Sequence, residues 1–148
     1  MEYRVATEKD IPVICQIRKQ QLIDEGSKPD IDIDEELQCY FEKKFEEGSI
    51  VEWMLEDEGK IIATAAILFF EFPPNYSYRN VVKGYITNMY TAPEYRGRGI
   101  ASAMLSKLAD EAKKRGVHQI WLIASKLGRP VYKRFGFTES DDYLTMSL

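Results

Sequence analysis

The spacing of apolar side chains predicts two strands and two helices in the first third of the chain. The segments Glu2–Ala6 and Ile50–Leu55 are predicted to be strands. Between them, two segments repeat apolar residues every three or four positions, as the buried side of a helix does. The first helix is predicted to begin at Thr7, and the second runs from Asp32 or Asp34 to Gly48. Their apolar stripes are Ile11, Ile14, Cys15 and Leu22 in the first helix, and Ile33, Leu37, Tyr40, Phe41 and Phe45 in the second.

The rest of the chain predicts a hairpin, a helix between two strands, and a short C-terminal helix and strand. The polar turn Glu56–Lys60 joins Ile50–Leu55 to a second strand, Ile61–Phe72, and a third strand follows at Val81–Tyr90. A long amphipathic helix then begins at Ile100 and is ended by Gly116. The remaining predicted elements are a strand at Gln119–Ala124, a short helix at 130–136 and a strand at Tyr143–Ser147. The order β-α-α-β-β-β-α-β-α-β predicts a mixed α/β fold with an antiparallel hairpin and one βαβ unit.

Length and charge narrow the classes of function. A chain of 148 residues and 17.2 kDa is expected to form one domain, residues 1–148. Its formal net charge of -4 argues against a nucleic-acid binder, which normally carries a basic surplus. The charge is divided unevenly, because residues 1–60 hold 17 acidic and 8 basic side chains while residues 61–148 hold 7 and 12. The C-terminal part therefore suits an anionic ligand.

The sequence also argues against a membrane protein, a secreted protein and a site built on cysteine pairs or histidine. The longest strongly apolar stretch, Ile61–Phe70, is far shorter than the ~20 residues of a membrane helix, and Met1–Arg4 contains no apolar signal core. Cys15 and Cys39 form no CxxC pattern and are expected to be small buried residues in a reducing cytoplasm. The only histidine, His118, is expected at the surface, so neither a His-based metal site nor a Ser-His-Asp triad is expected.

The most informative segment is the polar glycine loop between the third strand and the long helix. Gly97 and Gly99 let the backbone turn and expose its N–H groups, while the helix start adds unpaired donors and partial positive charge. Arg96 and Arg98 add full charges, so the loop suits a phosphate or pyrophosphate. A plain glycine-rich connection with solvated arginines is the alternative. Neither the GxxxxGK[ST] string nor a complete GxGxxG fingerprint is present.

The string Arg96-x-x-Gly99-x-Ala101 resembles the [Q/R]-x-x-G-x-[G/A] motif of the GNAT superfamily of acetyl-CoA-dependent N-acetyltransferases. Met89–Tyr95 resembles the lead-in to that motif, and Ala124–Phe137 resembles the second signature of the family, which ends in Y-x-x-x-G-F. The opening, Tyr3–Asp10, is also similar to the common first strand and helix start. The resemblance covers essentially the whole chain. It implies the GNAT fold, a mixed central sheet with antiparallel N-terminal strands and a parallel pair around the CoA-binding loop and helix.

The resemblance also implies an acetyl-CoA site without a metal. The third strand would splay from the next parallel strand, and pantetheine would lie in the gap. Backbone groups near Met89, Tyr90 and Thr91 would pair with pantetheine and polarise the thioester carbonyl. Ser125 stands where many members carry Asn, and its hydroxyl could contact pantetheine. The amides that would hold the pyrophosphate belong to Arg96, Gly97, Arg98, Gly99, Ile100 and Ala101, and the basic side chains that would lie near the phosphates or remain solvated are Arg129 and Lys133.

Tyr132 matches the tyrosine that commonly acts in the family as general acid toward the departing CoA thiolate. A thiolate leaving group needs a proton or a hydrogen bond, and a phenol supplies either; simple packing of the ring is the alternative. The general base has no clear candidate, because Tyr85–Tyr90 contains no carboxylate. Asn88 could hold a water, and Glu71 and Glu94 are candidates that also suit a solvated surface. No base is assigned.

The function predicted on this basis is transfer of an acetyl group from acetyl-CoA to a primary amine by direct attack. Cys15 and Cys39 lie outside both motifs, which gives no support to an acyl-enzyme. The alternatives are a non-catalytic module that binds or senses acyl-CoA and, more weakly, an interaction protein with another phosphate ligand.

The amine is expected to be a small molecule or a peptide, with no nucleic-acid or membrane partner, in the cytoplasm; homodimers are common in the family. An acidic cluster that would favour a cationic amine, or serve helix capping and solubility, comprises Asp24, Glu25, Asp30, Asp32, Asp34, Glu35 and Glu36.

Overall fold

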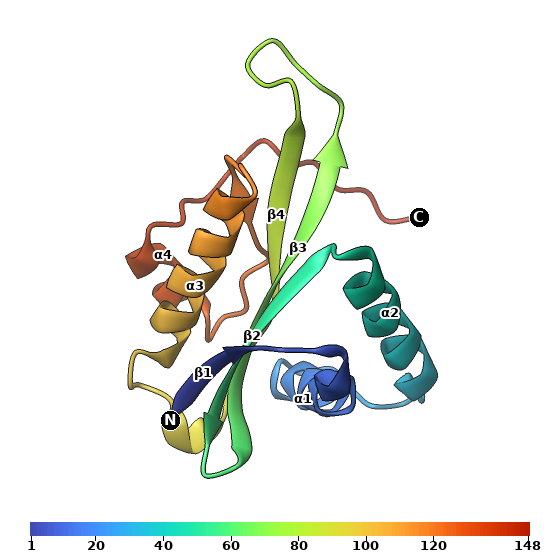
Figure 1. Cartoon of the computed structure of the whole chain (residues 1–148), viewed down its shortest axis with the longest axis vertical. Helices are drawn as coiled ribbons and strands as arrows, with labels where there is room; N and C mark the ends of the chain where they lie inside the picture. The colour runs from blue at the N-terminus through green and yellow to red at the C-terminus, as the bar shows by residue number, and fades with distance from the viewer.

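A five-stranded mixed sheet forms the centre of the computed structural model, which describes residues 1–148 (Figure 1). The strands follow one another across the sheet in chain order, with antiparallel pairing from β1 to β4 and parallel pairing between β4 and β5. The predicted mixed α/β architecture is therefore confirmed. The strands are β1 (Glu2–Val5), β2 (Ile50–Asp57), β3 (Lys60–Phe72), β4 (Val81–Thr91) and β5 (Ile120–Trp121).

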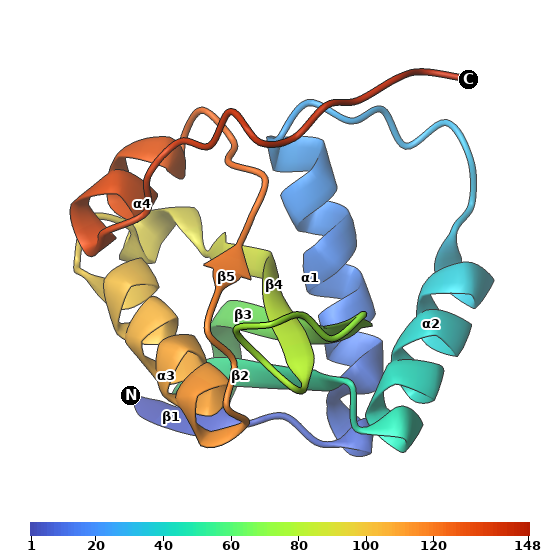
Figure 2. The same cartoon turned by 90° about the horizontal axis from the view of Figure 1, so that it is seen from above.

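Helices cover both faces of the sheet, α1 and α2 on one side and α3 and α4 on the other (Figures 1 and 2). Each forms close to where the hydrophobic pattern predicts it. A short 3₁₀ turn, Glu8–Asp10, precedes the first helix, and the Thr7 amide donates a 2.8 Å hydrogen bond to the Asp10 carboxylate. The helices are α1 (Ile11–Asp24), α2 (Asp34–Glu47), α3 (Ile100–Lys114) and α4 (Arg129–Phe135). None of these helices is long and apolar enough to cross a membrane.

Two apolar clusters hold the helices to the sheet. On one face, Leu105 and Leu108 of α3 pack against β2, β3 and β4 and are fully buried. On the other face, Ile14 of α1 and Phe41 of α2 pack against Met54 of β2. Since β3 is covered on both faces, every residue from Ile62 to Leu68 is buried, which accounts for an apolar run that only Thr64 interrupts.

Three expectations are wrong at the level of single elements. The strand predicted over Gln119–Ala124 contains only the two residues Ile120 and Trp121, and Tyr143–Ser147 forms no strand. The pattern in both segments shows strand propensity, but a strand also needs a partner, and the C-terminal segment pairs with no other strand. Cys39 is exposed on α2 rather than buried, whereas Cys15 is buried as expected.

Candidate functional site

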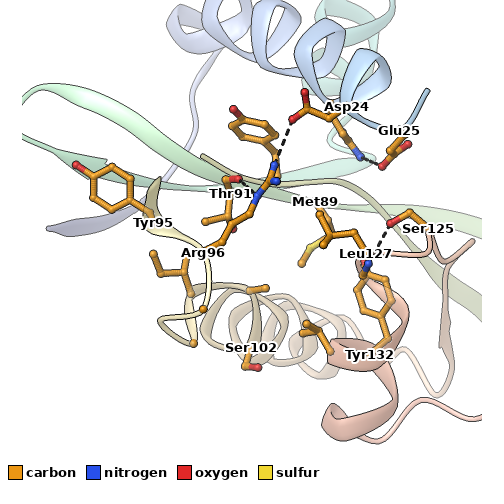
Figure 3. Close-up of a pocket in the computed structure, with 18 of the residues that line it drawn as sticks. Asp24, Glu25, Met89, Thr91, Tyr95, Arg96, Ser102, Ser125, Leu127 and Tyr132 are labelled. Atoms are coloured by element: carbon orange, nitrogen blue, oxygen red, sulfur yellow. Dashed lines mark hydrogen bonds and ion pairs between the residues drawn. The ribbon is translucent and has the colours of Figure 1, made fainter. Parts of the chain in front are cut away.

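A cavity of about 320 Å³ opens beside the C-terminal end of β4 (Figure 3). Its position follows from the short contact between the parallel strands, which pair only at Gly84–Ile120 and Tyr85–Trp121. Beyond those pairs the two segments run apart, and the cavity lies between them, the N-terminus of α3, helix α4 and the end of α1. Its lining includes most of the residues expected at the site, namely Met89, Tyr90, Thr91, Arg96, Gly97, Gly99, Ile100, Ala101, Ser125 and Tyr132.

A β-bulge in β4 forms the wall of the cavity. The pairing with β3 shifts by one residue, so that Asn88 and Met89 together stand opposite Ala65. Asn88 adopts a left-handed backbone conformation with φ 53°, and the Thr64 hydroxyl donates a 2.9 Å hydrogen bond to its carbonyl. The extra residue bends the strand and brings the three residues from Met89 to Thr91 to the cavity.

The glycine loop presents free amides to this cavity. Gly97 and Gly99 have φ values of 74° and 77°, a conformation that side-chain-bearing residues rarely adopt. The N–H groups of residues 99–102 donate to no protein acceptor, as expected for the first turn of α3. Four free donors at the positive end of a 15-residue helix are suited to an anionic ligand.

The two arginines of the loop lie in different places. Arg96 lines the cavity, where its Nε donates to the Thr91 carbonyl at 2.9 Å and its Nη2 donates to the Asp24 carboxylate at 3.2 Å. Arg98 lies outside the lining; it donates to the Glu94 carbonyl at 2.9 Å and stacks on the Tyr95 ring. Arg96 is therefore the loop cation that faces the site in this structure.

Tyr132 of α4 is 9% exposed and forms the wall of the cavity opposite the bulge in β4. The Phe137 ring packs against it edge-on at 5.9 Å, and a Cβ added to Gly128 would lie 2.7 Å from its ring. Burial raises the pKa of the phenol to about 12, and the negative charge of Glu25 acts in the same direction. The phenol therefore keeps its proton at neutral pH. Ser125 shares this wall, and its Oγ accepts a 3.1 Å hydrogen bond from the Gly128 amide.

The basic residue of α4 that lines the cavity is Arg134, which the sequence reasoning missed. Arg129 and Lys133 instead contact the Glu139 carboxylate at 2.6 Å and 3.1 Å, outside this cavity. The spacing of the lining residues explains the difference. Val131 and Arg134 are three positions apart on α4 and therefore share one helix face, a signal that was available in the sequence.

Two carboxylates of the acidic cluster, Asp24 and Glu25, reach the cavity from the end of α1. The members from Asp30 onward do not line it. Glu71 and Glu94, the residues considered as bases, also lie outside it, and Glu94 contacts the Lys60 ammonium at 3.7 Å. The structure thus adds no support for either of them as the base.

A fully buried carboxyl group lies behind the bulge. Glu52 of β2 is 0% exposed, and the Asn88 side-chain amide donates to its two oxygens at 3.3 Å and 3.4 Å. Burial raises the pKa of Glu52 to about 8, against the opposing effect of the Asn88 hydrogen bond. Sequence reasoning missed this residue. The alternation of Ile50, Glu52 and Met54, all buried on one face of the strand, was the available signal.

Comparison with known proteins gives a consistent family. Residues 13–137 match the Acetyltransferase (GNAT) family. A crystal structure described as "predicted acetyltransferase with acetyl-CoA" from Clostridium acetobutylicum is 55% identical, has a TM-score of 0.95, and is matched over 99% of this chain and 95% of that one.

Two curated relatives match over shorter stretches. A glucosamine 6-phosphate N-acetyltransferase from Trypanosoma brucei brucei is 23% identical over 90 residues, which are 61% of this chain and 59% of the relative. A thialysine N-epsilon-acetyltransferase from Mus musculus is 29% identical over 96 residues, which are 61% of this chain and 54% of the relative. The chain thus spans less than two thirds of the length of either relative.

Proposed function

The chain belongs to the GNAT family of acetyltransferases, and we propose that it transfers the acetyl group of acetyl-CoA to a primary amine. The observation that carries the proposal is the cavity, because it joins an anion site at one end to a buried protonated phenol at the other. The relative from Clostridium acetobutylicum, described with acetyl-CoA, supports the choice of co-substrate. The named activities of the two curated relatives support an amine acceptor.

The pyrophosphate of acetyl-CoA binds at the start of α3. The free amides of residues 99–102 donate to its oxygens, and the conformations of Gly97 and Gly99 leave the approach open, with nothing within 4 Å of a Cβ at either position. Arg134 adds positive charge from α4. Pantetheine then runs along the residues from Met89 to Thr91 toward Tyr132, with Ser125 beside it.

The reaction is a direct displacement at the thioester carbon. The neutral amine forms the new C–N bond, the C–S bond breaks, and the electron pair leaves with the CoA sulfur. Tyr132 donates a hydrogen bond or a proton to that sulfur, and the amine nitrogen gives up its proton to solvent. A phenolate formed by proton transfer takes a proton back from solvent. With a pKa near 12, the phenol is fully protonated when the thiolate departs.

The acceptor enters from the α1 side, where Asp24 and Glu25 line the cavity. Both carboxylates favour a ligand with positive charge, such as a diamine or an amino acid with a second amino group. Because Asp24 already contacts Arg96, Glu25 is the carboxylate with more freedom to hold the cation; its contact in the structure is with the Gln21 amide at 3.1 Å.

The first test is whether the chain binds acetyl-CoA. Ligand at 100 times its Kd stabilises the folded chain by about 2.7 kcal/mol, which a thermal melt detects. Ser102→Glu places a carboxylate among the free amides and is expected to abolish that shift, whereas Ser106→Glu on the exposed side of the same helix keeps it.

The second test is a screen of amines for CoA release. Release with at least one amine supports the proposal. Absence of a melting shift at millimolar acetyl-CoA overturns it. A shift without CoA release from any amine overturns transfer and favours an acyl-CoA-binding module.

A further inference from the structure

Tyrosine and cysteine aside, four polar side chains of this chain are buried, and three of them meet at one point. Glu52 of β2, Thr64 of β3 and Asn88 of β4 are 0%, 1% and 3% exposed, whereas the fourth, Gln21, lines the cavity. The Thr64 hydroxyl donates to the Asn88 carbonyl at 2.9 Å, and the Asn88 amide donates to the two Glu52 oxygens at 3.3 Å and 3.4 Å. Buried polar groups are costly, so their meeting at the bulge needs a reason.

Glu52 is the most costly of the three. It stands between Ile50 and Met54 on β2, and both of these residues belong to the apolar cluster beneath α1 and α2. Its only hydrogen-bond partner is the Asn88 amide. Burial raises the pKa of the carboxyl to about 8, which reflects the cost of placing a charge there. An apolar side chain of similar size would fill this position without that cost.

The contact between Glu52 and Asn88 passes over the strand that separates them. Glu52 pairs with Ala66 of β3, and Ala66 pairs with Thr87 of β4, the neighbour of Asn88. β2 and β4 are therefore about 10 Å apart at this point. Ala66 is fully buried and carries only a methyl group, so two longer side chains have room to meet above it. Together they tie β2 to β4 across β3.

The tie holds a residue in an unusual conformation. Asn88 and Glu58 are the non-glycine residues with positive φ, and Glu58 lies in the hairpin turn between β2 and β3. Asparagine tolerates the left-handed region better than most residues, but not without cost. The Thr64 hydroxyl fixes the Asn88 carbonyl and Glu52 fixes its side chain. The direction of the following peptide groups is set by the backbone angles of this one residue.

We propose that Glu52 is a positioning residue for acetyl transfer, because it anchors Asn88 in its left-handed conformation and thereby fixes the main chain of residues 89–91 along acetyl-CoA. This inference rests on the proposed function, in which that main chain borders pantetheine. Glu52 is fully buried, so it touches no substrate and acts on turnover only through Asn88. A misplacement of about 1 Å at reacting groups lowers rates by up to about 100-fold, so an anchor outside the cavity matters for turnover.

Two substitutions of Glu52 test the anchor. Leucine has a similar size but accepts no hydrogen bond, whereas the glutamine oxygen still accepts one from the Asn88 amide. With an amine that supports CoA release, kcat is expected to fall about tenfold or more in Glu52→Leu and to stay within about twofold in Glu52→Gln. The Kd of acetyl-CoA is expected to change less than kcat in both. A Glu52→Leu variant with the kcat of the parent chain overturns the proposal.

Substitutions of Asn88 separate the position of the bulge from general stability. Glycine adopts a φ of 53° without an anchor, so Asn88→Gly is expected to keep kcat within about threefold of the parent. In that background, Glu52→Leu should lower kcat by less than about twofold. Asn88→Ala should lose as much kcat as Glu52→Leu, because alanine disfavours positive φ. If Glu52→Leu lowers kcat equally in the parent and in the Asn88→Gly background, Glu52 acts by another route and the proposal is wrong.

Hydrogen exchange tests the anchor without any turnover. In Glu52→Leu the amides of residues 88–91 are expected to exchange about tenfold faster than in the parent, while those of α3 keep their rates. Glu52→Gln should exchange like the parent throughout. A parent chain that releases no CoA from any amine overturns the proposed function and the role in turnover, but these rates still decide whether Glu52 anchors the bulge. Equal exchange at residues 88–91 in Glu52→Leu and the parent overturns the anchor even where CoA is released.

Discussion

The Arg96 guanidinium and the Asp24 carboxylate, 72 positions apart in the chain, meet at 3.2 Å across the mouth of the cavity. The contact joins the loop that precedes α3 to the end of α1. It also places an acid of the N-terminal part beside a base of the C-terminal part, so the two oppositely charged regions of the sequence share one site.

Removing the charge of Asp24 is predicted to strengthen the binding of acetyl-CoA and to weaken the binding of a cationic amine. Asp24→Asn keeps the shape of the side chain but leaves Arg96 with more of its positive charge, so acetyl-CoA is expected to bind about two- to fivefold more tightly. A cationic amine loses a favourable charge, and its KM is expected to rise by a similar factor. Calorimetry and steady-state kinetics measure the two effects. Asp30→Asn, outside the cavity, serves as the control; parallel changes in both constants would contradict the prediction.

Loss of the Tyr132 hydroxyl is predicted to slow turnover without weakening acetyl-CoA binding. Tyr132→Phe preserves the packing against Phe137 but removes the proposed donor to the leaving sulfur, so kcat is expected to fall on the order of 10²–10⁴-fold. The Kd of acetyl-CoA is expected to stay within about twofold. Tyr76→Phe, at a fully exposed tyrosine, is the matched control. A kcat equal to that of the parent chain would exclude Tyr132 as the acid.

Gly128→Ala is predicted to act through Tyr132. The added Cβ would lie 2.7 Å from Cε2 and 3.1 Å from the hydroxyl oxygen of Tyr132, so the ring must move. We expect kcat to fall at least tenfold. Combining Gly128→Ala with Tyr132→Phe should lower kcat little beyond Tyr132→Phe alone, because both changes remove the same contribution. If the two reductions in kcat multiply in the double variant, Gly128 affects turnover by a route other than the position of Tyr132.

The buried carboxyl of Glu52 predicts that stability falls as pH rises. Its pKa is raised from about 4.5 to about 8, so between these values the folded chain holds a proton that the unfolded chain has released. The free energy of unfolding is expected to decrease over this range by up to about 1.4 kcal/mol per pH unit and to level off above pH 8. Chemical denaturation at pH 5.5, 7 and 8.5 measures the change.

Glu52→Gln is expected to remove that contribution. The amide oxygen still accepts from the Asn88 side chain but does not ionise, so at pH 8.5 this variant should be more stable than the parent chain by a few kcal/mol. Glu46→Gln, at an exposed position of α2, should keep the parent's pH dependence. If the Glu52→Gln variant and the parent lose stability equally between pH 5.5 and 8.5, Glu52 does not carry a raised pKa.

Most of the architecture followed from local patterns. The stripe of α3 and the cap at Gly48 each depend on neighbours within a few residues, and each appears where the pattern placed it. The turn predicted over Glu56–Lys60 is also present, although the strands on either side of it extend to Asp57 and begin again at Lys60. The geometry of the loop from Arg96 to Ala101 followed for the same reason, because its glycines and the free amides of a helix start are local features.

Only the tertiary structure determined the features that depend on contacts between segments far apart in the chain. Residues 143–147 have the propensity of a strand, but they pair with no strand of the sheet. The bulge at Asn88, the burial of Glu52 beneath it and the meeting of Arg96 with Asp24 arise between segments far apart in the chain. Side-chain periodicity is set by the backbone of one element, whereas register, burial and charge pairing are set by the elements packed against it.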